Sequence, residues 1–296
     1  MSWMRTIFNN WKAEYNLRQK EHRFVQGLAA AGDVLRQHAS DENTVNFSHT
    51  GHAGDIIYSI PAMYALAGGR KMALYLKLNQ PALDFTPSMK HPNGSVMLTA
   101  KSVELFAPLL LAQPVFVACE ALNDQRVDYD LTAFRALPFD YRMGSIARWY
   151  FLTFGVTRDL GKPWLQATPD NRYRDAVVIA RSSRYHSPGI DYSFLKKYER
   201  LVFVGVPDEY DEMKKVLPAL EYAPVKDFLG LASIIAAGRL FIGNQSFPFS
   251  LAEAMKVRRV LEVYHQCPNV IVEGAEGYDF CYQPQFEKIV GDLLGK

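Results

Sequence analysis

The pattern of hydrophobic and polar positions changes near residue 44. Before it, residues 3–38 contain no proline, many good helix formers and three consecutive alanines, and this pattern predicts one long helix. After it, short apolar runs alternate with stretches of helical character. Apolar strands that alternate with helices are typical of parallel sheets covered by helices on both faces. The pattern therefore predicts an α/β protein with a leading helix.

The apolar runs form two series, separated by a polar segment, residues 155–175, that glycine and proline interrupt and that we interpret as a linker. The first series predicts strands at 44–50, 71–78 and 115–121 and helices at 55–69, 102–113 and 144–155. The second predicts strands at 175–182, 201–206, 239–244 and 259–264 and helices at 193–199, 208–216, 226–238, 249–256 and 285–295. We expect two Rossmann-like domains facing a cleft, residues 44–160 and 161–296, behind a helical extension, residues 1–43.

Composition narrows the class of protein. With 296 residues, 49% of them hydrophobic, the chain can bury cores for two domains, and its net charge of +2 argues against a dedicated nucleic-acid binder without excluding local basic clefts. Cys119, Cys267 and Cys281 are odd in number and lack metal-ligand spacing, which favours a reducing compartment. No run reaches the roughly 20 apolar residues of a membrane span. The first residues lack the apolar region of a signal peptide, so we expect a cytoplasmic protein.

The leading helix has a mildly basic and partly apolar character. Six basic residues stand against three acidic ones, and Trp3, Ile7, Phe8 and Trp11 add apolar surface. This composition fits a weak contact with a membrane surface. It also fits a helix that docks on the body of the protein or on a partner subunit, and we favour docking.

Candidate chemistry lies in the loops after the strands, because ligands of open α/β sheets bind beyond the carboxyl ends of the strands. The first such loop is HTGHAGD, residues 49–55. Its glycines allow the backbone to approach a ligand closely. Asp55 begins the next helix, where it is either a helix cap or a functional carboxylate.

The second loop, residues 179–189, follows the first strand of the second series. Arg181 and Arg184 stand there beside Ser183, at a strand end. Guanidinium and hydroxyl groups in this position form a plausible phosphate-binding site. A solvated loop is the equally weighted alternative.

The third loop, residues 204–212, contains Gly205, Asp208 and Glu209. Carboxylates at the start of a helix interact favourably with the helix dipole, and this is the favoured interpretation. They could also accept hydrogen bonds from ribose hydroxyls, so Gly205 and Glu209 remain candidate nucleotide-binding residues.

The fourth loop gives the strongest local signal. A strongly apolar strand ends in Asn244, Gln245 and Ser246, and a helix follows within a few residues. This layout directs backbone N–H groups towards an anion and leaves side-chain amides ready for hydroxyl groups.

The remaining motif is a DxD triplet, Asp128-Tyr129-Asp130. In some sugar transferases such a triplet holds a metal ion, but it is common by chance and no other ligand cluster accompanies it here. We therefore expect no metal site and no cofactor.

Two motifs resemble the glycosyltransferase family 9 group, the heptosyltransferase-like enzymes of the GT-B fold. Gly54-Asp55-Ile56-Ile57 followed by Pro61 matches the family's first motif, in which the proline closes a helical turn. LASIIAAGRLFIGNQSFPFSLAEAM, residues 231–255, follows the order of its second motif. The resemblance covers residues 44–296. Gln245, Phe247 and Ser250 depart from it, replacing the family's aspartate, glycine and histidine, so we expect an altered donor pocket.

The resemblance implies a function and a distribution of roles. The enzyme would transfer a sugar from a nucleotide-sugar donor, with inversion and without a metal, to a glycan or a lipid-linked acceptor. Asp55 would be the catalytic base, and His49 and His52 would lie on the acceptor side. The donor would contact Gly54, Arg181, Ser183, Arg184, Gly205, Glu209, Asn244, Gln245 and Ser246.

Two other functions remain open. A GT-B enzyme of the phage type would transfer sugar to modified DNA bases, and the low net charge speaks mildly against this nucleic-acid partner. Alternatively, the altered IGNQSFPFS loop indicates lost catalysis, and the protein binds a sugar nucleotide or a glycan.

Overall fold

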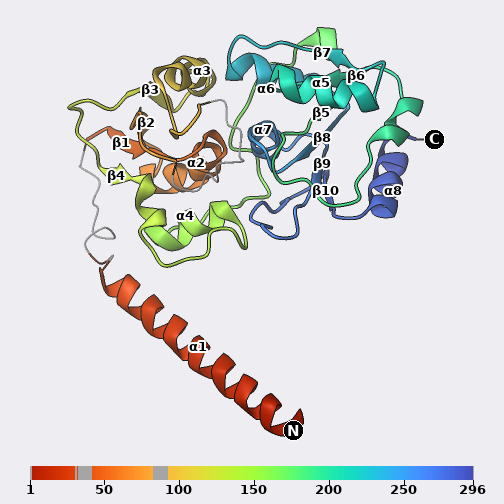
Figure 1. Ribbon diagram of the computed structural model, residues 1–296. Coiled ribbons are helices and arrows are strands. Elements are labelled where there is room, and N and C mark those ends of the chain that lie inside the picture. The colour runs from red at the N-terminus through yellow and green to blue at the C-terminus, as the bar shows by residue number, and fades with distance from the viewer. Residues whose placement is uncertain (1, 31, 33–41, 83–92, 296) are drawn as a thin grey trace.

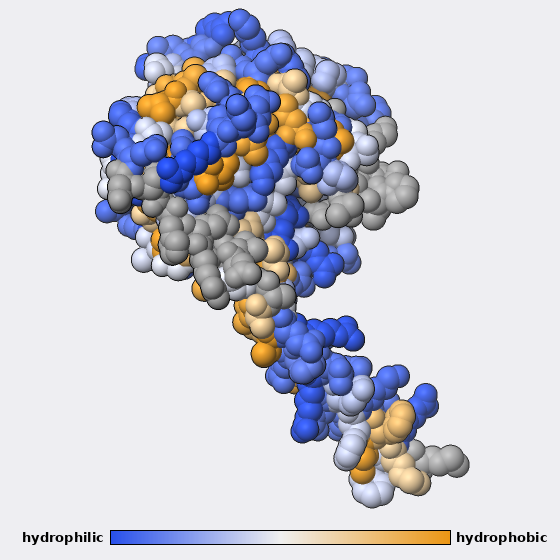
Figure 2. Space-filling view, turned by 90° about the vertical axis from the view of Figure 1, so that its left-hand side faces the viewer, coloured by the Kyte–Doolittle hydropathy of each residue, from blue (hydrophilic) through white to orange (hydrophobic). Residues whose placement is uncertain are grey.

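The computed structural model describes residues 2–30, 32, 42–82 and 93–295. Helix α1, Ser2–Ala30, projects from the body of the molecule, as Figures 1 and 2 show. The predicted continuation of this helix to residue 38 lies almost entirely outside the described residues. Within the described residues, none of the helices combines the length and the apolar character that crossing a membrane requires.

The first half of the body is built on a parallel sheet of four strands in the order β3-β2-β1-β4. The strands are β1 (Thr44–His49), β2 (Lys71–Leu76), β3 (Phe116–Ala121) and β4 (Tyr129–Asp130). Its helices are α2 (Ala53–Ala67), α3 (Ala100–Leu111) and α4 (Ile146–Phe154), with the 3₁₀ helix η2 (Leu131–Arg135) after β4.

The second half contains a parallel sheet of six strands in the order β10-β9-β8-β5-β6-β7. The strands are β5 (Val177–Ala180), β6 (Leu201–Phe203), β7 (Glu221–Tyr222), β8 (Leu240–Asn244), β9 (Arg259–Glu262) and β10 (Gly277–Phe280). The helices are α5 (Pro207–Val216), α6 (Phe228–Ala237), α7 (Phe247–Met255) and α8 (Gln283–Leu294), with 3₁₀ helices η3 (Asn171–Tyr173) and η4 (Ser193–Lys197).

These elements confirm the predicted α/β class with two parallel sheets and a leading helix. The strands that the pattern missed are short ones, β4, β7 and β10. The segment 193–199, predicted to be α-helical, forms the 3₁₀ helix η4. The sheets fall inside the predicted segments 44–160 and 161–296, which we retain as proposed domains.

The two halves pack against each other through helices, visible side by side in Figure 1. Helix α2 contacts α7, and α3 contacts α6. One buried hydrophobic cluster includes residues of both sheets, such as Phe47 of β1 and Leu261 of β9. Rings from three helices meet at this junction, where Phe228 lies 4.1 Å from Phe247 and 4.8 Å from Phe106 between centroids.

Helix α2 runs through Pro61, so this proline does not close the helical turn as the resemblance implied. A proline inside a helix has no N–H for the carbonyl four residues earlier, here that of Ile57. The indole Nε1–H of Trp164 donates to this carbonyl at 3.1 Å, and Trp164 is only 4% exposed. The linker thus satisfies the acceptor that Pro61 leaves unpaired, and the helix can continue.

Candidate active site

The first cluster forms where β1 leads into α2. His49 is fully buried, and its Nδ1 accepts the backbone N–H of Gly51 at 2.7 Å. Because Nδ1 is an acceptor, the neutral ring carries its proton on Nε2 and donates it to the Tyr150 hydroxyl at 2.8 Å. Burial lowers the pKa of His49 from 6.5 to about 4. His49 is therefore neutral near pH 7.

Asp55 lies in the first turn of α2, as predicted, and is 8% exposed. Its Oδ2 accepts the His52 backbone N–H at 3.3 Å and the Arg135 Nη2–H at 2.6 Å. Burial alone would raise the pKa of Asp55, but Arg135, followed by His52 and His49, lowers it below its ordinary value. Asp55 is therefore both a capping residue and an ionised carboxylate, and neither of these bonds uses Oδ1.

Arg135, like Tyr150, is a residue of this cluster that the sequence did not reveal. It ends η2, and its guanidinium lies 4.9 Å from the ring centroid of Tyr141 and 5.2 Å from that of Phe134. These rings and the ion pair with Asp55 fix its orientation. No local pattern marks it, because 80 residues separate it from Asp55.

The two glycines of this loop have different surroundings. A Cβ at Gly51 would lie 2.5 Å from His49 Cε1 and 2.8 Å from Asp55 Oδ2, so only glycine fits there. A Cβ at Gly54 would meet no atom within 4 Å. The N-terminus of α2 thus has open space at Gly54, which the family resemblance implies is a donor contact.

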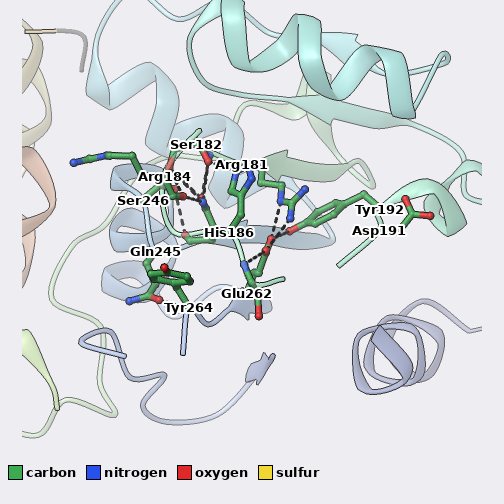
Figure 3. Close-up of polar contacts among 12 residues, drawn as sticks. Arg181, Ser182, Arg184, His186, Asp191, Tyr192, Gln245, Ser246, Glu262 and Tyr264 are labelled. Atoms are coloured by element: carbon green, nitrogen blue, oxygen red, sulfur yellow. Dashed lines mark hydrogen bonds and ion pairs between the residues drawn. The ribbon is translucent and has the colours of Figure 1, made fainter. Parts of the chain in front are cut away.

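The second cluster forms at the ends of β5, β8 and β9 (Figure 3). Arg181 makes a bidentate ion pair with Glu262, with both N–O distances at 2.8 Å. Glu262 is fully buried and also accepts the Ser187 backbone N–H at 2.7 Å and the Tyr192 hydroxyl at 2.9 Å. Glu262 thus fixes the loop that contains Arg181, and its only sequence signal was a lone carboxylate in an apolar strand.

Arg184 has a different orientation. Its side chain points away from the Glu262 network in Figure 3, and its backbone carbonyl accepts a hydrogen bond from Asn244 Nδ2. Asn244 Oδ1 accepts the Ser182 backbone N–H at 3.0 Å. Asn244 is fully buried and therefore shapes the loop around Arg184.

Gln245 and Ser246 complete the loop before α7. Gln245 Nε2 donates to the Cys267 carbonyl at 2.6 Å and to Asn269 Oδ1 at 3.0 Å, and its Oε1 accepts the Tyr264 backbone N–H at 2.6 Å. Gln245 thus holds the segment after β9. Ser246 stands at the N-cap of α7, next to the first N–H groups of that helix.

A cavity of about 1070 Å³ separates the Arg181 loop from α5. Arg181, Ser183 and His186 line one side, and Glu209 and Met213 line the other. The Ser183 backbone N–H donates to Glu209 at 3.2 Å, and burial raises the pKa of this carboxyl group. The backbone carbonyl of Gly205 accepts a hydrogen bond from the Tyr222 hydroxyl at 3.0 Å. A Cβ at Gly205 would lie 3.2 Å from the Glu209 carboxylate.

The DxD triplet is used inside the protein. Asp128 accepts the Asn46 backbone N–H at 2.9 Å, and Asp130 pairs with Lys77 at 2.6 Å. In the part of the chain that the structure describes, no three or more His, Cys, Asp or Glu side chains gather as metal ligands would.

Comparisons with known proteins identify the fold. No protein-family model and no curated protein matches the sequence. Among solved structures, the chain is similar to the heptosyltransferase WaaC of E. coli, with ADP-2-deoxy-2-fluoro heptose (TM-score 0.54) and with ADP (TM-score 0.55). Both comparisons have 10% identity and cover 84% of this chain and 99% of WaaC.

A further similar structure is the iron-containing dodecameric glycosyltransferase TibC of enterotoxigenic E. coli H10407. It has a TM-score of 0.51 and 15% identity, covering 81% of this chain and 65% of TibC. The protein thus has the GT-B-like fold of heptosyltransferases.

Proposed function

We propose that the protein is a nucleotide-sugar-dependent glycosyltransferase of the heptosyltransferase-like family 9 type. The observation that carries the proposal is Asp55, kept ionised by Arg135 in the first turn of the helix after β1. The fold, which WaaC shares in a complex with an ADP-heptose analogue, supports the donor class. The acceptor would be a glycan or a lipid-linked sugar.

Asp55 would act as the base of an inverting transfer. It takes the proton of the acceptor hydroxyl on Oδ1 while that oxygen attacks the anomeric carbon. The nucleoside diphosphate leaves from the opposite face of the sugar. His49 is neutral, because burial lowers its pKa, so it would position the acceptor loop through Gly51, with His52 on the acceptor side.

The leaving diphosphate would be stabilised by this chain's own cations and helix termini. Arg184 points away from the Glu262 network and is the foremost phosphate contact, whereas Arg181 positions the loop through Glu262. The N-terminus of α7 at Ser246 adds backbone N–H groups. Ser183 and Glu209, which line the cavity beside α5, would hold the nucleoside, with Gly205 in the chain just before α5.

Replacement of Asp55 tests the proposal. Asp55→Asn removes the base and should lower turnover at least about a hundredfold, with donor affinity nearly unchanged. Asp227→Asn is the control, because Asp227 caps α6 through the Gly230 N–H at 2.9 Å and stands outside the proposed site. If Asp55→Asn turns over within a few-fold of the natural protein, Asp55 is a helix cap and the base is another group.

The nucleotide itself is found by a thermal-shift screen of nucleoside diphosphates and sugar nucleotides, since a specific ligand raises stability by mass action. With the best ligand, Arg184→Ala should weaken diphosphate binding by about 1.5–3 kcal/mol, the range of a charge-assisted hydrogen bond. Arg200→Ala, an exposed arginine of the same half, is the control. Equal calorimetric affinities would place the phosphate elsewhere.

Metal independence is tested separately. The proposed cationic contacts supply the charge that a metal ion would otherwise supply. Turnover should therefore be the same with and without EDTA. Loss of activity with EDTA and recovery with a divalent ion would contradict this part of the proposal.

A binding protein without catalysis is the second candidate, favoured by one observation. Gln245 and Phe247, two positions that depart from the family motif, are occupied by structural contacts with Cys267 and Phe228. Tight binding of a sugar nucleotide with no transfer or hydrolysis would select this function.

A further inference from the structure

The first half of helix α1 exposes a stripe of large apolar side chains. The stripe consists of Trp3, Met4, Ile7, Phe8, Trp11 and Tyr15. Trp3 is 73% exposed and Trp11 is 74% exposed. Residues three and four apart share one face of a helix, so these side chains form a continuous surface. Figure 2 shows hydrophobic side chains gathered at the far end of α1.

Among the described residues, the contacts of α1 with the body lie away from this stripe. The contacts that place α1 lie near its C-terminal end, where the Phe24 ring is 6.2 Å from that of Phe139. A Cβ at Gly27 would lie 3.0 Å from Pro138, so the helix meets the body closely there. Beyond this point α1 extends away from the body (Figure 1). The expected docking of this helix on the body is therefore seen near its C-terminal end and does not extend to the stripe.

A second copy of the helix is a poor occupant of the stripe. A helical pair buries positions that repeat in heptads. One possible seam has Met4, Trp11 and Arg18 at its first heptad position. Its second heptad position is then occupied by Ile7, Glu14 and Glu21. A second possible seam has Phe8, Tyr15 and His22 at one heptad position. Trp11 and Arg18 occupy the other position. The apolar stripe ends at Tyr15, and beyond it either seam would bury charged or titratable groups. Pairing with a second copy of the helix is therefore unfavourable.

The charge on α1 favours an anionic surface. The helix contains five basic and two acidic residues, a net charge of +3: Arg5, Lys12, Arg18, Lys20 and Arg23 against Glu14 and Glu21. Arg5 follows Met4 and Lys12 follows Trp11, so both lie about 100° round the helix from the stripe, at its edge. Long basic side chains in this position reach phosphate groups while the apolar face is buried.

We propose that α1 binds the surface of a bilayer that contains anionic phospholipids. The stripe enters the boundary between headgroups and acyl chains, where tryptophan is favoured, and Arg5 and Lys12 pair with lipid phosphates. This proposal goes beyond the glycosyltransferase function and does not depend on it. If both hold, α1 would keep the enzyme at the surface where a lipid-linked acceptor lies.

Vesicle co-sedimentation of the full-length protein tests the proposal. Vesicles of phosphatidylcholine with about one third phosphatidylglycerol should bind the protein at low salt, and vesicles of phosphatidylcholine alone should bind it less. The double variant Phe8→Glu, Trp11→Glu should lower the partition coefficient at least about tenfold. Arg5→Gln and Lys12→Gln should each lower it roughly fivefold on anionic vesicles only.

Asn9→Glu is the matched control, because Asn9 is exposed and lies at least about 100° round the helix from every residue of the stripe. It should bind vesicles within about twofold of the natural protein. All variants should keep the melting temperature of the body, since the stripe contributes nothing to its core. The proposal is overturned if anionic vesicles do not bind the protein, or if Asn9→Glu weakens binding as much as the double variant. It is also overturned if light scattering shows an oligomer that the double variant dissociates without any vesicle binding.

Discussion

Arg135 tunes the carboxylate on which the proposed chemistry depends. Its guanidinium is the main group that lowers the pKa of Asp55. Arg135→Gln removes this charge, so the pKa of Asp55 should rise and the acid limb of the pH–turnover profile should move to higher pH. Turnover near neutral pH should change less than in Asp55→Asn, because the carboxylate remains. A profile with an unmoved acid limb would show that Asp55 is not the group that titrates.

The loss of the ion pair also affects stability. The folded-state pKa of Asp55 lies below the ordinary value of 3.8. The ion pair therefore stabilises the fold above that pH, and this contribution is lost as the pH falls through the lowered pKa. Asp55→Asn leaves Arg135 without its anion, so we expect a lower melting temperature than simple loss of a cap would cause.

His49 gives the fold a pH dependence of its own. Its pKa falls from 6.5 to about 4 because it is buried. Between these values the unfolded chain binds a proton that the folded chain does not, so stability should decrease by about 3 kcal/mol as the pH falls from 6.5 to 4. His49→Gln should remove this part of the dependence in urea unfolding, whereas His265→Gln, at an exposed position, should retain it. If both variants show the same dependence of unfolding free energy on pH, His49 is not the group responsible.

Gln245 illustrates what the sequence could and could not predict. The sequence placed it correctly after a buried strand, but not its partners, Cys267 and Asn269, which lie on a distant loop. In the same way, Arg135 lies 80 residues from Asp55 in the sequence, and Glu262 lies 81 residues from Arg181. Local periodicity determines an element, whereas such pairs arise only when the sheet order brings strand ends together.

Gln245→Glu should therefore destabilise the protein. The variant keeps the size of the side chain but replaces an amide donor with an oxygen that faces the Cys267 carbonyl and Asn269 Oδ1. A buried unsatisfied group costs about 1–3 kcal/mol in unfolding free energy. Gln80→Glu, at an exposed position, should cost much less. Equal urea midpoints would mean that the loop after β9 does not depend on Gln245.

At the level of helices and strands, the long periodic segments were predicted well and the short ones were not. Strands β4 and β7 have two residues each, too few for an alternating pattern. Helix α2 was predicted across Pro61, but the reason it tolerates a proline is the Trp164 indole from the linker. That compensation lies 107 residues from Ile57 and has no local signature.

A double-mutant cycle tests this compensation. Trp164→Phe removes the N–H donor to Ile57 and should cost about 1–3 kcal/mol beyond the small change in packing. In a Pro61→Ala background the backbone N–H of residue 61 can bond to Ile57 instead. The cost of Trp164→Phe should then be smaller by about 1 kcal/mol or more in urea unfolding. Additive effects would show that the indole is not the partner that Pro61 makes necessary.

For the whole molecule, the shared hydrophobic cluster predicts that the two halves unfold together. Residues of both sheets belong to one buried cluster, and α2–α7 and α3–α6 contacts join them. Tertiary fluorescence and near-ultraviolet circular dichroism should therefore report one coincident urea transition for the body. Two separate transitions would show that the halves are independent domains connected only by the linker.

Phe247 is one of the residues that join the two halves. Its ring lies 4.1 Å from that of Phe228 of α6 and 5.8 Å from that of Phe106 of α3, which belongs to the other half. Phe247→Ala should cost about 2–4 kcal/mol, because it removes aromatic contacts at a partly buried junction. Phe194→Ala is a matched control, since that ring packs on Phe286 at 4.8 Å within the second half. In hydrogen-exchange mass spectrometry, Phe247→Ala should speed exchange in both α3 and α6, whereas Phe194→Ala should speed it around α8 alone. If both variants leave exchange in α3 unchanged, other contacts stabilise the junction. Phe247 would then be part of the proposed donor loop without joining the halves.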